Sequence, residues 1–313
     1  MNEIKDRLKL ILEMRNNILK YEDPLGLTDE FYQLNIEDDP KGEYLLFTGR
    51  EYVIAGVMSS IVDYLIKAGD KLVKIFTLMK SLSRHTIRLI ASRSKLLSRF
   101  KEIPVKLAQI LRQHNISLRY IPELDLYPGT LLWEYGFKDE FIEHAKKIYN
   151  KLSSTKVKGI ITLSPHSTEI LKIIYPKYLN LDSLQILHYS QILTNYKLNT
   201  RRLDATATYH DPCHLVRELE IIEEPRKIIR YIVKEYIDHK YSGKRTSCCG
   251  APIEGLIPTL SRELARHRIR ELSELPIDYI VVSCPFCLAN LLSAANKDKP
   301  KVIDLIELLD LSI

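Results

Sequence analysis

Apolar residues along the chain follow two alternating patterns, short continuous runs and longer segments with a helical period. Short apolar runs bounded by turn residues are typical of buried strands, and they occur at 43–48, 116–121, 157–163, 205–210 and 277–283. Apolar positions with a helical period occur at about 3–20, 51–68, 137–152, 225–237 and 256–273. Strands that alternate with helices predict parallel βαβ units and an α/β fold.

An internal repeat divides this pattern into two similar lobes. The segment 158–171 aligns with 278–291, and a glycine-containing turn precedes each copy, at 127–129 and at 248–250. The spacing is nearly the same in both copies: 35 residues lie between Pro128 and Ser164, and 34 lie between Cys249 and Cys284. We therefore predict an N-terminal helix with its linker and two pseudo-repeated lobes, over residues 1–42, 43–200 and 201–313.

The first lobe contains a strongly basic insertion. Eleven Lys or Arg and one acid lie between residues 71 and 112, although the net charge of the whole chain is only +6. The apolar period across about 70–114 predicts one or two long amphipathic helices, interrupted before Pro104. The positive charge is therefore local, and a general description of the chain as basic would be misleading.

The basic insertion has two interpretations: a solvated helical face, or a docking surface for an acidic partner or an anionic membrane surface. Nucleic acid is not expected, because no aromatic stacking platform or binding motif accompanies the charge. The cations of the docking surface would be Lys71, Lys74, Arg84, Arg88, Arg93, Lys95 and Arg99.

The composition is that of a globular protein, with 45% hydrophobic and 27% charged residues. We find no uninterrupted apolar run of about 18 residues or more. Residues 1–17 mix acids and bases and lack the apolar core of a signal peptide. We expect a cytoplasmic protein, with peripheral binding at the inner membrane face as an option through the basic insertion.

All five cysteines fall in one pattern, C-x34-C-C-x34-C-x-x-C. They lie where predicted strands meet predicted helices, and parallel strands present their carboxyl ends at one edge of the sheet. Helix N-termini lower the pKa of a thiol and stabilise anionic clusters. The sequence therefore predicts one metal centre, whose ligands are Cys213, Cys248, Cys249, Cys284 and Cys287.

Several kinds of centre remain open at this point. Zinc and an ordinary cubane iron–sulfur cluster each take four protein ligands, so five thiolates favour a larger or rearranged iron–sulfur core. A disulfide oxidoreductase that uses only the CxxC pair would leave Cys248 and Cys249 without a role. The five could also be small buried hydrophobic residues without function.

Four further residues accompany the cysteines. His210 and His214 flank Cys213 and could donate hydrogen bonds to cluster sulfurs or move a proton. Arg217 could neutralise cluster charge, and Gly250 would permit close approach of the backbone. Each histidine also has a purely structural interpretation, and a structural role is our prediction for His166 in the first lobe.

The segments HDPCHLVRE, SCCGAP and VVSCPFCLANLL resemble the cysteine-rich CCG domain of heterodisulfide reductase and of related glycolate and lactate oxidase iron–sulfur subunits. The resemblance covers about residues 205–296 closely and 43–178 as a degraded first copy. It implies an iron–sulfur cluster, 4Fe–4S or non-cubane, on the five cysteines of the second lobe. The first lobe should hold none, because other residues stand at the ligand positions, namely Arg50, Tyr127, Pro128, Ser164 and Ser167.

The resemblance further implies an oxidoreductase subunit that works with partner subunits. It would transfer electrons between a flavoprotein or ferredoxin-type partner and a disulfide, a quinone or a hydroxyacid-linked substrate. Relatives often carry a ferredoxin domain, and its cysteine repeats are absent from this sequence. The alternatives are a pure electron relay and a zinc-binding scaffold without chemistry of its own, and no catalytic side chain is predicted.

Overall fold

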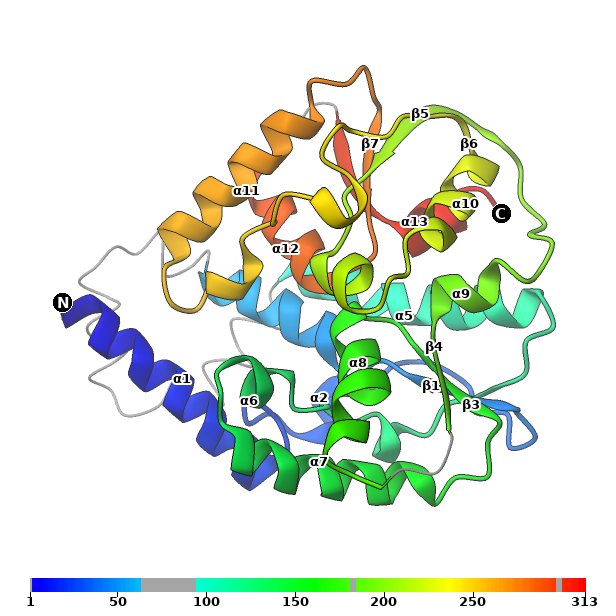
Figure 1. The fold of residues 1–313 in the computed structure, drawn as a ribbon. Helices are drawn as coiled ribbons and strands as arrows, with labels where there is room; N and C mark the ends of the chain where they lie inside the picture. The colour runs from blue at the N-terminus through cyan, green and yellow to red at the C-terminus, as the bar shows by residue number, and fades with distance from the viewer. Residues whose placement is uncertain (1, 63–93, 181–183, 297–299) are drawn as a thin grey trace.

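The computed structural model describes residues 2–62, 94–180, 184–296 and 300–313. Within these ranges the protein has two four-stranded parallel sheets, each with helices packed around it (Figure 1). The predicted α/β fold with two pseudo-repeated lobes is thereby confirmed. None of the described helices is both long and apolar enough to cross a bilayer.

The first sheet lies in the lower half of Figure 1 and has the strand order β2-β1-β3-β4. Its strands are β1 (Tyr44–Phe47), β2 (Leu118–Arg119), β3 (Gly159–Thr162) and β4 (Gln185–His188). The central strand β3 is buried along its whole length, as its unbroken apolar sequence predicts.

The second sheet repeats this topology with the order β6-β5-β7-β8. Its strands are β5 (Leu203–Tyr209), β6 (Val233–Tyr236), β7 (Tyr279–Val282) and β8 (Lys301–Asp304). In both sheets the first strand along the chain lies between the second and the third, so the two lobes share one chain path.

Helices surround both sheets. Those of the N-terminal segment and first lobe are α1 (Asn2–Tyr21), α2 (Asp29–Tyr32), α5 (Lys95–Gln113), α6 (Thr130–Glu134), α7 (Lys138–Ser153), α8 (Pro165–Glu169) and α9 (Tyr189–Leu193). Residues 51–62 are also helical. Those of the second lobe are the π-helical turn η4 (His214–Glu218), α10 (Glu223–Ile232), α11 (Pro258–Leu272), α12 (Pro285–Ala294) and α13 (Leu305–Asp310).

The repeat extends to the way the last strand of each lobe ends. His188 ends β4 and forms a capping box with Gln191 at the start of α9. Asp304 ends β8 and forms the same box with Glu307 at the start of α13. A capping box satisfies the free N–H groups of a helix start, so both copies use the same local solution with different side chains.

The two lobes are packed against each other through a shared apolar core. One hydrophobic cluster combines residues of both sheets with the buried face of α5, which runs between the lobes in Figure 1. Tyr52 of the first lobe donates a hydrogen bond to Asp304 of the second at 2.8 Å. Arg99 on α5 forms a two-bond ion pair with Glu307. These contacts fix the position of one lobe relative to the other.

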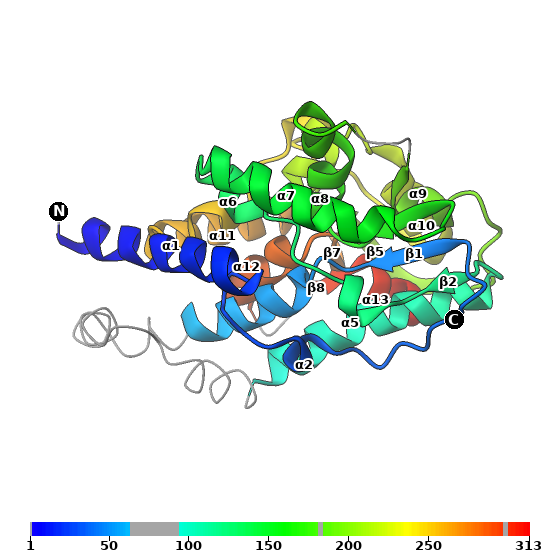
Figure 2. The same cartoon turned by 90° about the horizontal axis from the view of Figure 1, so that it is seen from below.

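Helix α1 lies along the outside of this body. Both views place it beside α6 and α7, with the N-terminus at the far end (Figures 1 and 2). Arg15 anchors it through an ion pair with Glu140 of α7. The apolar face of α1 is thereby held next to the junction of the two lobes.

Two element predictions were wrong, and the three strands β4, β6 and β8 were not predicted. The helix expected over 225–237 ends at Ile232, and β6 follows it directly; the helical period of its sequence continues, but pairing with β5 overrides it. Pro104 lies inside α5 and does not interrupt it. The strands β4 and β8 did not stand out as apolar runs, because each has only two consecutive apolar residues between polar ones.

Candidate metal centre

The cysteines of the second lobe lie at the carboxyl ends of β5 and β7. Cys213 is the N-cap residue of η4, and Cys284 is the N-cap residue of α12 with Pro285 in the first turn. Cys287 is therefore in the first turn of α12 as well. Proline suits this position, because the N–H group that it lacks would have no partner within the helix. Cys284 and Cys287 therefore both lie at the positive end of α12.

The loop that carries Cys248 and Cys249 is held in place by a buried ion pair. Asp211 is fully buried and accepts two hydrogen bonds from Arg226, at 2.7 and 2.8 Å. The same carboxylate accepts from the backbone N–H of Gly243 at 2.8 Å. This network fixes the loop before the cysteine pair to the end of β5.

Gly250 allows the backbone to turn tightly after the cysteine pair. Its φ of 86° lies in the left-handed region, and a Cβ atom there would come within 2.6 Å of the Ser261 carbonyl oxygen. Its N–H donates to the sulfur of Cys248 at 3.3 Å. Asn290 of α12 donates to the Cys249 carbonyl at 2.6 Å, which ties the turn to the helix.

The five thiols form one continuous group. Cys248 is hydrogen-bonded to Cys213 and to Cys249. Cys287 is hydrogen-bonded to Cys249 and to Cys284. All five are free thiols without a disulfide. Three separate stretches of the sequence thus deliver sulfur atoms to one place.

The thiols shift one another's ionisation. The hydrogen bond between Cys213 and Cys248, together with burial, raises the pKa of Cys213. Conversely, hydrogen bonds from Cys213 and Cys249 lower the pKa of Cys248 to about 2. Burial alone would raise the pKa of Cys284, but hydrogen bonds from Cys287 and His166 hold it well below its usual range. The group therefore combines thiolates with thiols that donate to them.

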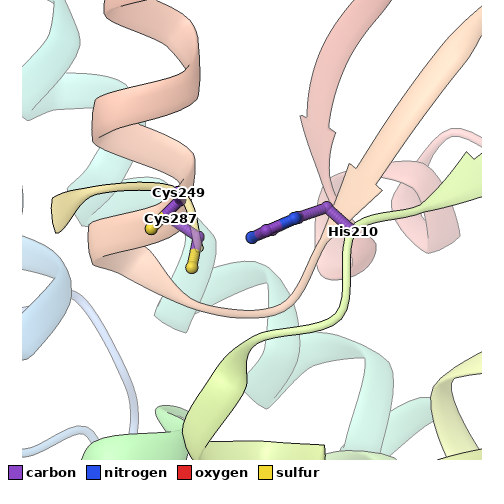
Figure 3. A group of neighbouring side chains, drawn as sticks. All are labelled: His210, Cys249 and Cys287. Atoms are coloured by element: carbon purple, nitrogen blue, oxygen red, sulfur yellow. The ribbon is translucent and has the colours of Figure 1, made fainter. Parts of the chain in front are cut away.

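His210 lies against the thiols from the end of β5. Figure 3 shows its ring directed toward Cys249 and Cys287, and a ring nitrogen and the two sulfurs lie within 4.8 Å of one another. Arg268 donates to Nδ1 of His210 at 3.2 Å. Burial, and then the charge of Arg268, lower the pKa of His210 to about 3. A neutral His210 that accepts at Nδ1 carries its proton on Nε2, so this N–H is available to a sulfur atom.

A largely apolar pocket opens beside the thiols, and its empty space, including the solvent at its mouth, is about 960 Å³. Four of the five cysteines line it, and Cys248 does not. Its apolar wall combines α1, the helix at 51–62 and both lobes, through Leu10, Met14, Met58, Leu131 and Phe286. The pocket therefore lies between the lobes, and α1 closes one side of it.

The first lobe contributes a polar group to this pocket that the sequence did not predict. His166 on α8 is hydrogen-bonded to Cys284 and to Glu134, at 3.1 Å from the carboxylate. Burial alone would lower the pKa of His166, but these two contacts raise it well above its usual value. The structural role of His166 stays a prediction, and these contacts place the side chain beside the thiols. In the repeat it aligns with Phe286, and that exchange of an apolar for a polar side chain was the available signal.

His214 and Arg217 contact other groups than the cysteines. His214 stacks on His166 with ring centroids 4.0 Å apart, and it is hydrogen-bonded to Glu169. Arg217 donates to the carbonyl oxygens of Lys244 and Thr246, so it holds the loop before Cys248. These contacts give Arg217 a structural task.

The equivalent site of the first lobe contains hydroxyls and a carboxylate. Glu51 is fully buried and accepts hydrogen bonds from Thr130 at 2.8 Å and from the Ser167 hydroxyl at 2.7 Å. Arg50, which aligns with Cys213, instead donates to the Asp125 carbonyl and to Asp29. The described residues of this site contain no cysteine.

The predicted docking surface is only partly within the described residues. Lys71, Lys74, Arg84, Arg88 and Arg93 lie outside them, as does the side chain of Lys95. Arg99 is described, and its guanidinium is paired with Glu307. The docking role of the segment stays a prediction.

By its fold and site, the chain is an α/β protein in which five cysteines lie together at the carboxyl ends of parallel strands. Residues 207–292 match the family model of the cysteine-rich domain, CCG. The second lobe is thus similar to this domain over the stretch that carries the three cysteine motifs. The match spans all five cysteines.

The chain is also similar to larger redox proteins. It is 26% identical over 222 residues to a fumarate reductase (CoM/CoB) subunit of Methanothermobacter marburgensis, covering 68% of this chain and 44% of that protein. It is 28% identical over 215 residues to a dihydromethanophenazine:CoB–CoM heterodisulfide reductase subunit of Methanosarcina barkeri, covering 64% and 53%. It is 27% identical over 231 residues to the probable iron-sulfur-binding oxidoreductase FadF of Bacillus subtilis, covering 69% and 32%. The chain thus spans about half or less of these relatives.

Proposed function

We propose that this chain is an iron–sulfur redox subunit that binds one cluster on Cys213, Cys248, Cys249, Cys284 and Cys287. The observation that carries the proposal is the continuous group of five free thiols delivered by three loops of the second lobe. The donor chemistry fits, because thiolates are the usual ligands of iron–sulfur clusters. The names of the relatives point the same way, since they include an iron-sulfur-binding oxidoreductase and two reductase subunits.

The surroundings of the thiols suit an anionic cluster. The first turn of α12 presents free N–H groups beside Cys284 and Cys287. His210 offers its Nε2–H toward the sulfurs, and Gly250 donates its own N–H to Cys248. A bound cluster would supply one-electron transfer, and the chain's own residues hold it and offset its charge.

We further propose that the chain reduces or oxidises a substrate in the pocket, in addition to relaying electrons. The cluster would occupy the part of the pocket beside the thiols. The apolar wall that Leu10, Met14 and Met58 form would leave room for a substrate, which a pure relay does not need. A disulfide with apolar substituents fits this lining. Its reduction to two thiols takes two electrons and two protons, and a flavoprotein or ferredoxin-type partner would supply the electrons.

Two further assignments belong to the same proposal. The cluster is of the 4Fe–4S type, cubane or non-cubane. Five thiolates exceed the four that zinc or a cubane binds, which favours the non-cubane form. Quinones and hydroxyacid-linked compounds remain alternative substrates of the same electron transfer. A zinc-binding scaffold is the competing function, and iron analysis separates it from ours.

The test is to add a small aliphatic disulfide, such as diethyl disulfide, to the anaerobically purified and reduced chain. We expect the electron paramagnetic resonance spectrum of the bound cluster to change. Met58→Trp narrows the pocket and should suppress the response without loss of iron, because Met58 lines the pocket away from the thiols. Tyr231→Trp, on the exposed side of α10, is the matched control.

The outcomes separate the alternatives. A bound cluster whose spectrum ignores the disulfide supports the relay and contradicts a substrate pocket. A response that is equal in Met58→Trp and wild type also contradicts the pocket. Purified protein that contains zinc but neither iron nor labile sulfide contradicts the proposal as a whole.

A further inference from the structure

A group of histidine and glutamate side chains lies at the junction of the lobes, apart from the five cysteines. Glu134 ends α6, His166 lies in α8 and His214 begins η4. One carboxylate oxygen and two ring nitrogens of these residues lie within 4.8 Å of one another. Two of the three residues come from the first lobe and one from the second.

We propose that Glu134, His166 and His214 bind one divalent transition-metal ion, with zinc as the best match. Two histidines and one glutamate are a ligand set that zinc uses in sites with an open coordination position. This centre would be separate from the one on the cysteines, and its existence does not depend on an iron–sulfur cluster.

The spacing of the ligand atoms agrees with a shared ion. Ligands about 2.0–2.1 Å from zinc at tetrahedral angles lie roughly 3.3 Å apart. The carboxylate oxygen of Glu134 is 3.1 Å from Nδ1 of His166 and 3.6 Å from Nε2 of His214. The second separation is too long for a hydrogen bond, so these two atoms face each other without bonding directly.

Both histidines have the partners that orient metal ligands. Nδ1 of His214 is hydrogen-bonded to Glu169, a buried carboxylate, which leaves Nε2 free on the side of Glu134. His166 is hydrogen-bonded to Cys284, in addition to its contact with Glu134. Metal-binding histidines commonly donate their second ring N–H to such an acceptor.

The position of the site suggests what its open coordination position would hold. Glu134, His166 and His214 all line the same pocket as the cysteines. A metal ion there would bind an anionic sulfur or oxygen atom of a molecule in the pocket, next to Cys284. It would also connect the lobes, since its ligands come from both of them.

The test is equilibrium dialysis of the anaerobically purified protein against micromolar zinc chloride, with zinc and iron measured by mass spectrometry. We expect wild type to take up one zinc ion per chain that Glu134→Gln and His214→Gln do not, while the iron content of all three stays equal. Glu169→Ala should weaken zinc binding about 10- to 100-fold, because it removes an orienting partner.

Two variants on the exposed face of α11, Glu263→Gln and His267→Gln, are the matched controls and should bind zinc as wild type does. Zinc should also raise the melting temperature of wild type but not of Glu134→Gln. Equal zinc uptake by wild type, Glu134→Gln and His214→Gln, or none by wild type, would overturn the proposal. Loss of iron in wild type would instead count against the proposed function.

Discussion

The two lobes have sites at equivalent positions, but different side chains fill them. At the carboxyl ends of β1 and β3 the buried groups are hydroxyls around the carboxylate of Glu51. At the carboxyl ends of β5 and β7 the corresponding positions hold thiols that are hydrogen-bonded to one another and, at Cys284, to His166 of the first lobe. In both copies a left-handed glycine, Gly129 or Gly250, ends the turn beside the site.

The difference shows what each copy needs in order to be stable. The first site is complete in itself, because Glu51 accepts hydrogen bonds from Thr130 and Ser167. The second has several thiols in contact, and the hydrogen bonds that Cys249 and Cys287 make to neighbouring cysteines, together with burial, raise the pKa of both well above the usual value. The proposed metal centre would replace these S–H protons and bind all five as thiolates. Under that proposal, the first copy keeps the fold and the second provides the chemistry.

The largest effect should follow from breaking the anchor of the second site. Asp211→Ala removes the fully buried partner of the Arg226 guanidinium and leaves it only half-exposed Asp238, which we expect to lower the free energy of unfolding by about 3–5 kcal/mol. Chemical denaturation of anaerobic protein measures it. Asp238→Ala is the control, because Asp238 is a half-exposed partner of the same arginine and should cost about 1 kcal/mol or less. Equal losses would contradict the anchoring role of Asp211.

The glycine pair offers a direct comparison of the lobes. Alanine in the left-handed region costs about 1–3 kcal/mol. At Gly129 the added Cβ meets the ring of His144 at 2.9 Å, whereas at Gly250 it meets a backbone oxygen at 2.6 Å. We therefore expect Gly250→Ala to destabilise more than Gly129→Ala in thermal unfolding, and only Gly250→Ala to lose iron. An equal iron content in both variants would count against a centre at Cys248 and Cys249.

The smallest effect concerns the pH dependence of stability in the first lobe. Burial raises the pKa of Glu51 above its ordinary value of 4.5. The folded chain then keeps a proton that the unfolded chain releases, so stability falls as the pH rises from 4.5 to the raised pKa. Glu51→Gln cannot ionise and should flatten this part of a stability–pH curve. The exposed Glu263→Gln should leave the slope unchanged, and an unchanged slope in Glu51→Gln would contradict the assignment.

The second lobe could be predicted from the sequence in more detail than the first. Cysteines, prolines and a glycine stand at its predicted strand ends and turns. The positions of Cys213, Cys284 and Gly250 could therefore be predicted from the local sequence. The strand β6 was hidden, because its residues continue the period of α10 and only pairing with β5 makes them a strand. Short strands owe their structure to neighbours that are distant in the sequence.

The contribution of the first lobe to the site could not be predicted from the sequence. Glu134, His166 and His214 are far apart along the chain, and only the packing of the lobes brings them together. His166 looked structural because it lies in a copy without cysteines. Its contact with Cys284 depends on the orientation of one lobe relative to the other, which no local pattern encodes.

The central claim is that the five thiols of the second lobe bind one iron–sulfur cluster. The most direct test is to measure iron and acid-labile sulfide in anaerobically purified wild type beside Cys249→Ser, with Ser167→Ala of the first lobe as the control. We predict at least about four iron and four sulfide per chain in wild type and in the control, and a loss of most of both in Cys249→Ser. Wild-type protein with zinc and no sulfide, or a Cys249→Ser variant with full iron content, would contradict the claim.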